Sequence, residues 1–122
     1  MPLTVNRLPV TTQGLLPFHL VAANSTNATT IAIGQRQMYG WAITNTNAAA
    51  RYICFHDVSS IPTAGLGIYF KYGIPASGAS NQSFDFGIQF VNGLSITTVV
   101  NPADNDATAV AASDLIINIF YR

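Results

Sequence analysis

Charged side chains are what this sequence most lacks: 8% of its 122 residues are charged, glutamate is absent, and Lys71 is the single lysine. Ordinary soluble proteins carry about 25%. Because five Lys and Arg residues are balanced by five Asp residues, no basic patch can follow a phosphate backbone, and we expect no nucleic-acid partner. Such a surface repels its neighbours weakly. It is typical of a chain covered by partner subunits, although a soluble protein made polar by Asn, Thr, Ser and Gln is the alternative.

Cysteine pairs and long apolar runs are missing too. The one cysteine, Cys54, can form no disulfide within the chain. No run reaches the roughly 18–20 apolar residues that a membrane-spanning helix needs. The start, MPLTVNRLPV, has neither the charged nor the apolar region of a secretory signal. We therefore expect synthesis in a cytoplasm and no membrane partner.

No His, Cys and carboxylate residues recur at metal-ligand spacing. His19 and His56 lie far apart, each among apolar neighbours, which indicates structural histidines. Cys54 and His56 share one face of an expected strand. Residues two apart on a strand are separated by about 7 Å, too far for a hydrogen bond between thiolate and imidazole. We therefore expect Cys54 to be buried and inert, and we expect no metal and no cofactor.

Acidic residues are too few for acid–base catalysis. Asp104-Asn105-Asp106 resembles half of a calcium-binding loop, but the glycine and the terminal glutamate of an EF-hand are missing. A polar turn is the simpler interpretation, and cation binding by Asp104 and Asp106 stays open from the sequence. No Ser-His-Asp order and no pair of catalytic carboxylates can be argued. We therefore expect a protein that is not an enzyme.

What the sequence does contain is a series of short runs in which apolar and polar residues alternate, as in half-buried β-strands. Loops rich in Asn, Ser, Gly and Pro separate about eight or nine such runs. A single open sheet would leave its apolar face in water. The sequence therefore predicts an all-β fold, a single-domain antiparallel β-sandwich that is jelly-roll-like. Outside the central stretch, the expected strands are Leu15–Val21, Thr29–Ile33, Leu66–Tyr72, Ser83–Phe90, Gly93–Val100 and Asp114–Arg122.

The central stretch, Gln37–Asp57, is predicted to be a hairpin at the heart of the core. Two strands flank the Asn-rich link Asn45–Ala48, whose chemistry favours a reversal of the backbone. Alternation places Tyr39, Trp41 and Ile43 on one face, and the apolar row continues after the turn. The only tryptophan of the chain is therefore expected in the core.

Alternation also predicts the faces of the later strands. Two inward rows are expected: Leu66, Ile68, Phe70 and Tyr72, and then Phe84, Phe86, Ile88 and Phe90. Gly87 predicts a bulge within the second of these strands. Pro17 predicts an edge strand or a bulge near the start. The last strand is apolar on both rows, which indicates a position inside a sheet.

The first residues differ from the rest. Leu3–Val10 is expected to be extended, because Pro2 and Pro9 block a helix and remove backbone donors. We expect residues 1–12 to form an extended arm that lies on a neighbouring subunit, and residues 13–122 to form the β-sandwich domain. The predicted partner interface consists of the apolar side chains of this arm: Leu3, Val5, Leu8 and Val10.

Several segments of the chain form a recognisable set. YGWAITNTNAAARYICF at Tyr39–Phe55 fits the pattern GW-x-x-x-N-x-N-x-x-A-R-Y-x-x-F. IPTAG at Ile61–Gly65 and YGIPA at Tyr72–Ala76 follow, and AVAASDLIINIFYR closes the chain. Together these segments resemble a group of small structural proteins of tailed bacteriophages. The resemblance covers roughly Gln37–Arg122 and implies no catalytic residues. Cys54 departs from the pattern, because a lysine or a similar polar residue is expected there.

The resemblance implies a virion component, such as a capsid decoration or cement protein, usually oligomeric. We therefore expect a homo-oligomer, a trimer rather than a dimer, that binds the major capsid protein at subunit junctions on the capsid surface after synthesis in the host cytoplasm. The alternative is a receptor- or carbohydrate-binding module of a phage fibre or tail. Its candidate sugar-binding residues are the exposed tyrosines Tyr39, Tyr52 and Tyr69, although sheet aromatics belong more often to a core or interface.

Overall fold

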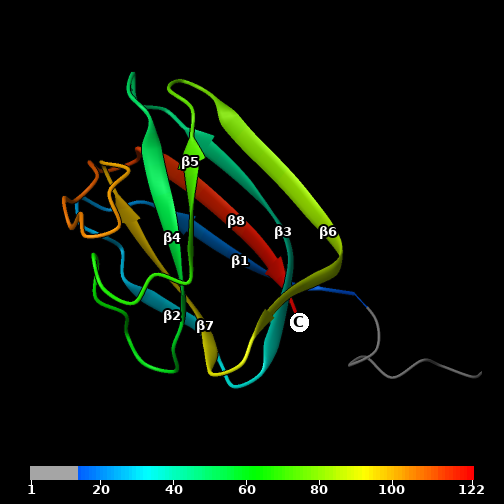
Figure 1. Cartoon of the computed structure of the whole chain (residues 1–122). Helices are drawn as coiled ribbons and strands as arrows, with labels where there is room; N and C mark the ends of the chain where they lie inside the picture. Colours follow the sequence, from blue (N-terminus) through cyan, green and yellow to red (C-terminus); the bar gives the residue numbers. More distant parts are fainter. Residues whose placement is uncertain (1–13) are drawn as a thin grey trace, which may run out of the picture.

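The computed structural model describes residues 14–122, and its regular structure consists of β-strands (Figure 1). Eight strands follow one another: β1 (Leu16–Val21), β2 (Thr29–Ile33), β3 (Arg36–Asn45), β4 (Arg51–Asp57), β5 (Phe70–Ile74), β6 (Ala79–Phe90), β7 (Gly93–Val99) and β8 (Leu115–Tyr121). The predicted strands that correspond to β1, β2, β7 and β8 are confirmed to within one residue at each end. Over this part of the chain, no helix has the length and apolar character needed to span a bilayer.

The strands form two antiparallel sheets of four, with the orders β1-β8-β3-β6 and β2-β7-β4-β5. Each strand of the first half pairs with its counterpart from the second half: β1 with β8, β2 with β7, β3 with β6 and β4 with β5. The chain is therefore one long hairpin wound around itself, which is the jelly-roll arrangement. Figure 1 shows the two layers facing each other. The predicted jelly-roll-like sandwich is confirmed.

Two predictions about position within a sheet are also confirmed. β1 is an edge strand, where the missing N–H of Pro17 removes no donor from a central ladder. β8 lies between β1 and β3. Ile117 and Ile119 of one row are fully buried, whereas Phe120 of the opposite row is 37% exposed.

The predicted hairpin at Gln37–Asp57 is wrong in its pairing. β3 and β4 both form, but they lie in opposite sheets. The Asn-rich link instead carries the chain from one layer to the other. The amide of Asn45 donates to the carbonyls of Ala49 (2.9 Å) and Ile74 (3.2 Å), and its oxygen accepts from the N–H of Asn47 (2.9 Å). These bonds tie the crossover to the end of β5, so a turn that suits a hairpin becomes a connection between sheets.

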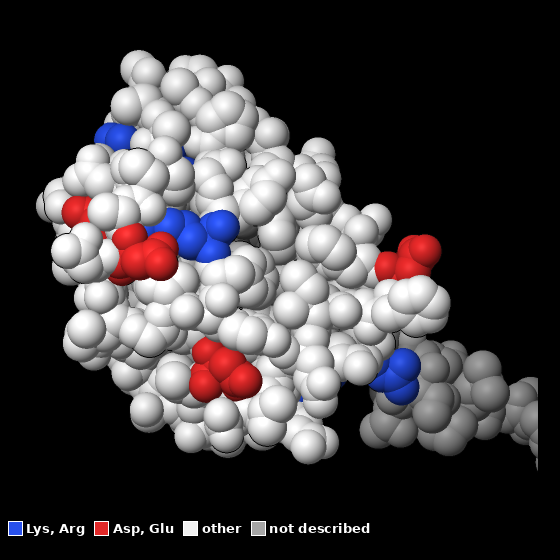
Figure 2. Space-filling view, in the orientation of Figure 1, with Lys and Arg blue, Asp and Glu red and all other residues white. Residues whose placement is uncertain are grey.

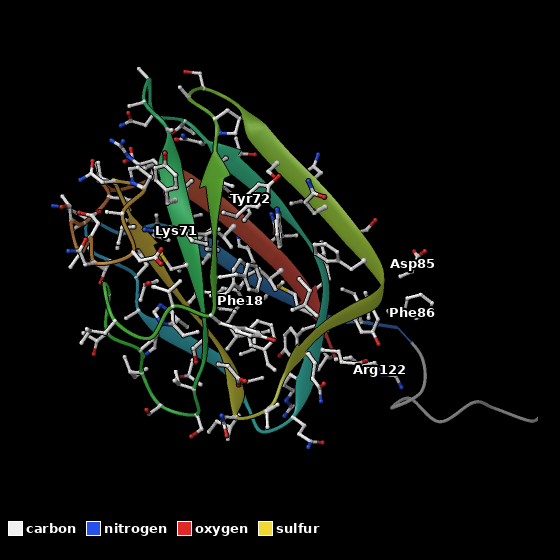
Figure 3. The ribbon with its side chains drawn as sticks, viewed as in Figure 1. Phe18, Lys71, Tyr72, Asp85, Phe86 and Arg122 are labelled. Atoms are coloured by element: carbon white, nitrogen blue, oxygen red, sulfur yellow. The ribbon has the colours of Figure 1, made fainter. Side chains whose placement is uncertain are left out.

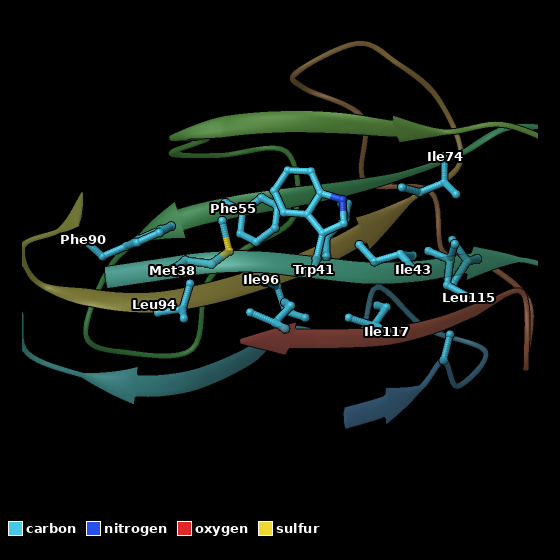
Figure 4. Close-up of a cluster of buried hydrophobic side chains, with 14 residues drawn as sticks. Met38, Trp41, Ile43, Phe55, Ile74, Phe90, Leu94, Ile96, Leu115 and Ile117 are labelled. Carbon is cyan, nitrogen blue, oxygen red and sulfur yellow. The ribbon is translucent and has the colours of Figure 1, made fainter. Parts of the chain in front are cut away.

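The core fills the space between the two sheets (Figure 4). Trp41 is 3% exposed, and its ring lies 5.4 Å from that of Phe55 across the sandwich, centroid to centroid. Its Nε1–H donates to the hydroxyl of Ser80 (3.1 Å). A bulge at Tyr39 shifts the register, so Met38 rather than Tyr39 shares the buried face with Trp41. The other fully buried large apolar side chains are Ile43, Ile53, Ile74, Phe90, Leu94, Ile96, Leu115, Ile117 and Ile119.

The strand predicted at Leu66–Tyr72 begins later than expected. Gly65 and Gly67 adopt φ angles of +82° and +62°, a left-handed conformation that breaks a strand. Residues before Phe70 therefore belong to a loop, and Leu66 is 67% exposed instead of inward. β5 begins at Phe70, whose side chain packs against the core as predicted.

The predicted inward row of β6 is wrong at one position. Phe84 and Ile88 pack against the core, but Phe86 is 92% exposed. Ser83 pairs with Gly40 of β3, and Ile88 pairs with Met38. The four β6 residues 84–87 therefore lie opposite a single β3 residue, Tyr39. Gly87 adopts a φ angle of +77° there. The bulge predicted from Gly87 is therefore confirmed, and it turns Phe86 out of the apolar row.

Candidate functional site

The open outer face of the β1-β8-β3-β6 sheet is the candidate functional site. Its side chains lie in three rows of four, one from each strand. We call these twelve residues the neutral face: Val21, Ile116, Thr44 and Ala79; His19, Asn118, Ala42 and Asn81; Pro17, Phe120, Gly40 and Ser83. None of them is Lys, Arg, Asp or Glu. Val21 and Phe120 add exposed apolar area, at 48% and 37% exposed. These twelve positions together therefore carry no formal charge.

Short side chains and hydrogen bonds organise the middle of the neutral face. The ring of His19 donates through Nδ1 to Asn118 Oδ1 (2.8 Å), and Asn118 Nδ2 donates to the carbonyl of Ala42 (3.2 Å). Gly40 is required by the pairing of β3 with β6, because a Cβ there would collide with the carbonyl oxygen of Gln82. The row across β1, β8 and β3 is therefore already hydrogen-bonded internally.

The outer face of the other sheet is closed by the chain's own loops. Its side chains Cys54, His56, Ser95 and Thr97 are at most 1% exposed. Two hydrogen bonds hold loop 58–69 against these side chains. Ser95 Oγ donates to the carbonyl oxygen of Val58 (2.9 Å), and His56 Nδ1 donates to the carbonyl oxygen of Gly67 (3.1 Å). Only one of the two sheets therefore presents its outer face.

Burial sets the protonation of the groups under these loops. Burial lowers the pKa of His56, outweighing its hydrogen bond to the carbonyl of Gly67, which acts in the opposite direction. The neutral ring donates through Nδ1 and accepts at Nε2 from the hydroxyl of Thr97 (2.8 Å). Burial also raises the pKa of the Cys54 thiol. The prediction that Cys54 is buried is confirmed, and His56 is held as a hydrogen-bonded neutral side chain.

His56 should make the stability of the fold depend on pH. Its folded-state pKa lies below the value near 6.5 of the unfolded chain, so the unfolded state binds more protons as the pH falls. We expect the free energy of unfolding to decrease as the pH is lowered from about 7.5 to 5.5, measured by urea denaturation. His56→Gln should flatten this dependence, whereas His19→Gln, on the exposed neutral face, should retain it. An unchanged slope in His56→Gln would contradict the assignment.

Residues far apart in the sequence meet at one point. Asp114, just before β8, accepts from Arg51 Nε (2.9 Å), from Asn47 Nδ2 (3.0 Å) and from the N–H of Ala111 (3.0 Å). The side chains of Arg51 and Asp114 are only 12% and 7% exposed. This buried ion pair locks the crossover between the sheets onto the start of β8. Sequence reasoning missed it, because nothing local marks which carboxylate pairs with Arg51.

Two other acidic residues, Asp57 and Asp106, also serve local structure. Asp57 accepts from the N–H groups of residues 91, 92 and 93 at 3.1, 2.7 and 3.2 Å, which holds the β6–β7 turn. Asp106 accepts from the N–H of Asn101 (3.0 Å) and the hydroxyl of Thr108 (2.8 Å). Burial alone would raise the pKa of Asp106, but the hydrogen bonds from Thr108 and Asn101 lower it to about 2. Asp106 thus closes its own polar turn, as the simpler interpretation predicted.

Across residues 14–122, no three His, Cys, Asp or Glu side chains come together in a way that could hold a metal ion. Asp104 is exposed. Figure 2 shows a few small groups of charged side chains on the face in view, which is otherwise uncharged.

The three tyrosines predicted as a sugar-binding face lie in different places. Tyr39 lines a shallow hollow of about 310 Å³ together with Gln35, Arg36, Gln37, Gln89 and Arg122. Tyr69 donates its hydroxyl to the carbonyl of Gln89 (3.0 Å), next to this hollow. Tyr52 belongs to the other sheet, where Lys71 Nζ lies 5.7 Å from its ring centroid. The structure therefore brings Tyr39 and Tyr69 near one hollow and leaves Tyr52 apart.

The arm residues named from the sequence, Leu3, Val5, Leu8 and Val10, lie outside the described residues. The neutral face, by contrast, was not identified from the sequence. Its signal is present in the alternation of Gly40, Ala42 and Thr44, which are small, uncharged and two residues apart in β3. That signal gains meaning only when the partners of β3 are known, because its neighbours come from both ends of the chain.

Comparisons with known proteins identify no family for this chain. No protein-family model matches the sequence, and no curated protein matches it. Among solved structures, the coat protein of tobacco streak virus aligns with 93% of this chain and 88% of its own, at 17% sequence identity and a TM-score of 0.35. What the chain itself establishes is an all-β jelly-roll sandwich of two four-stranded antiparallel sheets.

Proposed function

We propose that this chain is a non-enzymatic structural protein of a virion, a decoration or cement protein that binds where major capsid subunits meet and stabilises the head. The observation that carries the proposal is the neutral face. A partner that covers it removes no formal charge from water, and the centres of protein interfaces are depleted in charge. Because loop 58–69 closes the outer face of the other sheet, the neutral face is the sheet surface left for a partner.

The resemblance of residues 37–122 to tailed-phage virion proteins supports the same assignment. Within the proposal, the chain is made in the host cytoplasm, joins the capsid surface and forms a homo-oligomer, a trimer rather than a dimer. An extended arm of residues 1–12 can add backbone hydrogen bonds to a neighbouring subunit. Its proposed contacts with the major capsid protein are the apolar side chains Leu3, Val5, Leu8 and Val10.

Charges placed on the neutral face should disrupt capsid binding. We expect Asn81→Asp and Ser83→Asp each to weaken binding to empty capsids at least about tenfold, because a carboxylate buried without a partner is costly. Both side chains are exposed in the free protein, so the fold should tolerate the changes. Co-sedimentation with empty capsids of the encoding virus measures the binding. The matched control is Ala107→Asp, at an exposed position in loop 101–113, which should bind like the wild type.

The same assay separates the parts of the proposal. Equal binding by all three aspartate variants would remove the neutral face from the capsid contact. Deletion of residues 1–12 should weaken the same binding if the arm contributes. Failure of the wild-type chain to bind the capsid at any concentration would overturn the cement function.

A receptor- or carbohydrate-binding module is the second candidate, and the hollow at Tyr39 favours it. The hollow lies at the lower end of the range of small-ligand sites, and its glutamine and arginine side chains suit sugar hydroxyls or an acidic sugar. The phenol of Tyr39 is already hydrogen-bonded to Gln37 Oε1 (2.5 Å), which orients the ring. Glycan-array binding that is lost in Tyr39→Ala, together with absence from purified heads, would select this function instead.

A further inference from the structure

One large apolar side chain projects from the sandwich more than any other in residues 14–122. Phe86 is 92% exposed. Its neighbours along β6 are anchored, because Phe84 contacts the Trp41 ring at 5.5 Å between centroids and Ile88 packs against the core. Gly87, at φ +77°, turns the chain between these anchors. Figure 3 shows Phe86 pointing away from the body of the molecule, so the bulge presents it as a supported apolar knob.

An apolar hollow of about 260 Å³ lies in the loop between β4 and β5. Val58, Ile61, Pro62 and Leu66 contribute to its walls beside His56, Ser60, Thr63 and Gly67, and its lining includes no Lys, Arg, Asp or Glu. Ile61 and Leu66 are 65% and 67% exposed, and both line this one hollow, so they form a contiguous apolar rim rather than scattered exposed side chains. A cavity of about 150 Å³ suffices for a benzene molecule. The hollow is therefore large enough for a phenyl ring.

We propose that Phe86 of one copy inserts into the hollow of loop 58–67 on the next copy. The bend of β6 that carries Phe86 lies on one side of the molecule, and the β4–β5 loop lies on the other (Figures 1 and 3). A chain therefore cannot fill its own hollow, and two copies cannot exchange both contacts about a two-fold axis. The contact is head-to-tail and closes only as a ring of three or more.

A second copy fits this contact better than an unrelated partner does. Knob and hollow are both uncharged, and both belong to one chain. A Phe side chain buries about 150–250 Å², whereas a stable interface buries about 1,000 Å² or more. One knob is therefore a weak contact by itself. Closure of a ring, in which every copy makes two such contacts, strengthens it through effective concentration. The inference rests on the self-association in the proposed function and identifies its contact.

Sedimentation velocity over a concentration series tests the contact. Phe86→Ser and Leu66→Asp change exposed side chains and should each weaken self-association by about tenfold or more, because central aromatic anchors dominate interfaces. In an equimolar mixture of the two variants, the Phe86→Ser chain keeps an intact hollow and the Leu66→Asp chain keeps an intact knob. The mixture should form dimers at high concentration and nothing larger. Val21→Ser, which removes exposed apolar area on the neutral face, should leave self-association unchanged.

A photoreactive benzophenone side chain in place of Phe86 locates the contact directly. Cross-links between isotope-labelled and unlabelled copies that end within residues 58–67 support the proposal. Cross-links that end elsewhere, or only on capsid protein, overturn it. So does a wild-type chain whose self-association is unchanged by Phe86→Ser, and in that case capsid binding can still stand. Conversely, rings that depend on Phe86 but bind no capsid would overturn the cement function and leave this contact intact.

Discussion

Asp114→Asn is expected to lower the free energy of unfolding by about 3–5 kcal/mol, because removal of one partner leaves a buried charge uncompensated. Asp114 is 5% exposed and accepts hydrogen bonds from Arg51, Asn47 and the N–H of Ala111. The asparagine has nearly the same shape but cannot neutralise the guanidinium. Urea denaturation at neutral pH, followed by circular dichroism, measures the loss.

Two variants isolate the cause. Asp85→Asn makes the same chemical change at an exposed position and should alter stability by less than about 0.5 kcal/mol. In the double variant Arg51→Met with Asp114→Asn, no charge is left buried, so we expect it to be more stable than Asp114→Asn alone. A cost below about 1 kcal/mol for Asp114→Asn, or no recovery in the double variant, would contradict the role of the ion pair.

The carboxylate of Asp114 should also contribute to the loss of stability at acidic pH. Burial raises the pKa of Asp114, but the hydrogen bonds from Arg51, Asn47 and the backbone of Ala111 outweigh it and bring the pKa below the ordinary value of 3.8. The stabilisation is therefore complete above this unfolded-state pKa and is lost as the pH falls through the lower folded-state pKa. Asp114→Asn should flatten the dependence of stability on pH in this range.

Trp41→Ala should cost about 3–5 kcal/mol, the range for large aromatic truncations in a core. Trp41 joins the two sheets: besides Phe55, its ring contacts Tyr72 of β5 at 4.9 Å and Phe84 of β6 at 5.5 Å, centroid to centroid. The cavity left by alanine would separate strands that come from both sheets. Because Trp41 is the only tryptophan, circular dichroism rather than tryptophan fluorescence should follow the unfolding.

Trp41→Phe separates ring packing from the hydrogen bond. Phenylalanine keeps much of the aromatic contact but cannot donate to Ser80 Oγ, which lies 3.1 Å from Nε1. We expect a loss of about 1–3 kcal/mol, the cost of a buried polar group without its partner. Ser80→Ala should have a similar cost, because it removes the other half of the same bond. If Trp41→Ala costs no more than Trp41→Phe, the ring does not have the packing role assigned to it.

Alternation of apolar and polar residues predicts strands well here and strand partners poorly. The strands near both ends of the chain were located closely, because side chains on a strand must alternate between core and solvent. The same pattern wrongly paired β3 with β4, because a turn rich in asparagine suits both a hairpin and a crossover. Asn45 decides between them through bonds to Ile74, a residue 29 positions away.

Alternation also predicts the wrong face for a side chain wherever a β-bulge adds a residue to a strand. A strict period of two placed Tyr39 on the same face as Trp41 and placed Phe86 inward, and both residues lie in the one irregular stretch of the β3–β6 pairing. Gly87 predicted one bulge, but its effect on Phe86 depends on how many residues of β3 oppose it. The inward position predicted for Leu66 is wrong for a related reason. Gly65 and Gly67 have positive φ angles, so the residues before β5 are not in a regular strand and do not alternate.

The sequence by itself determined the all-β class, the sandwich, the core position of Trp41 and the scarcity of charge, because these follow from local backbone preference and composition. Only the tertiary structure decided that β3 and β4 face each other across the core, that Asp114 neutralises Arg51, and that uncharged residues from four strands form one open face. Each of these depends on contacts between segments tens of residues apart, and local patterns do not encode which distant segments meet.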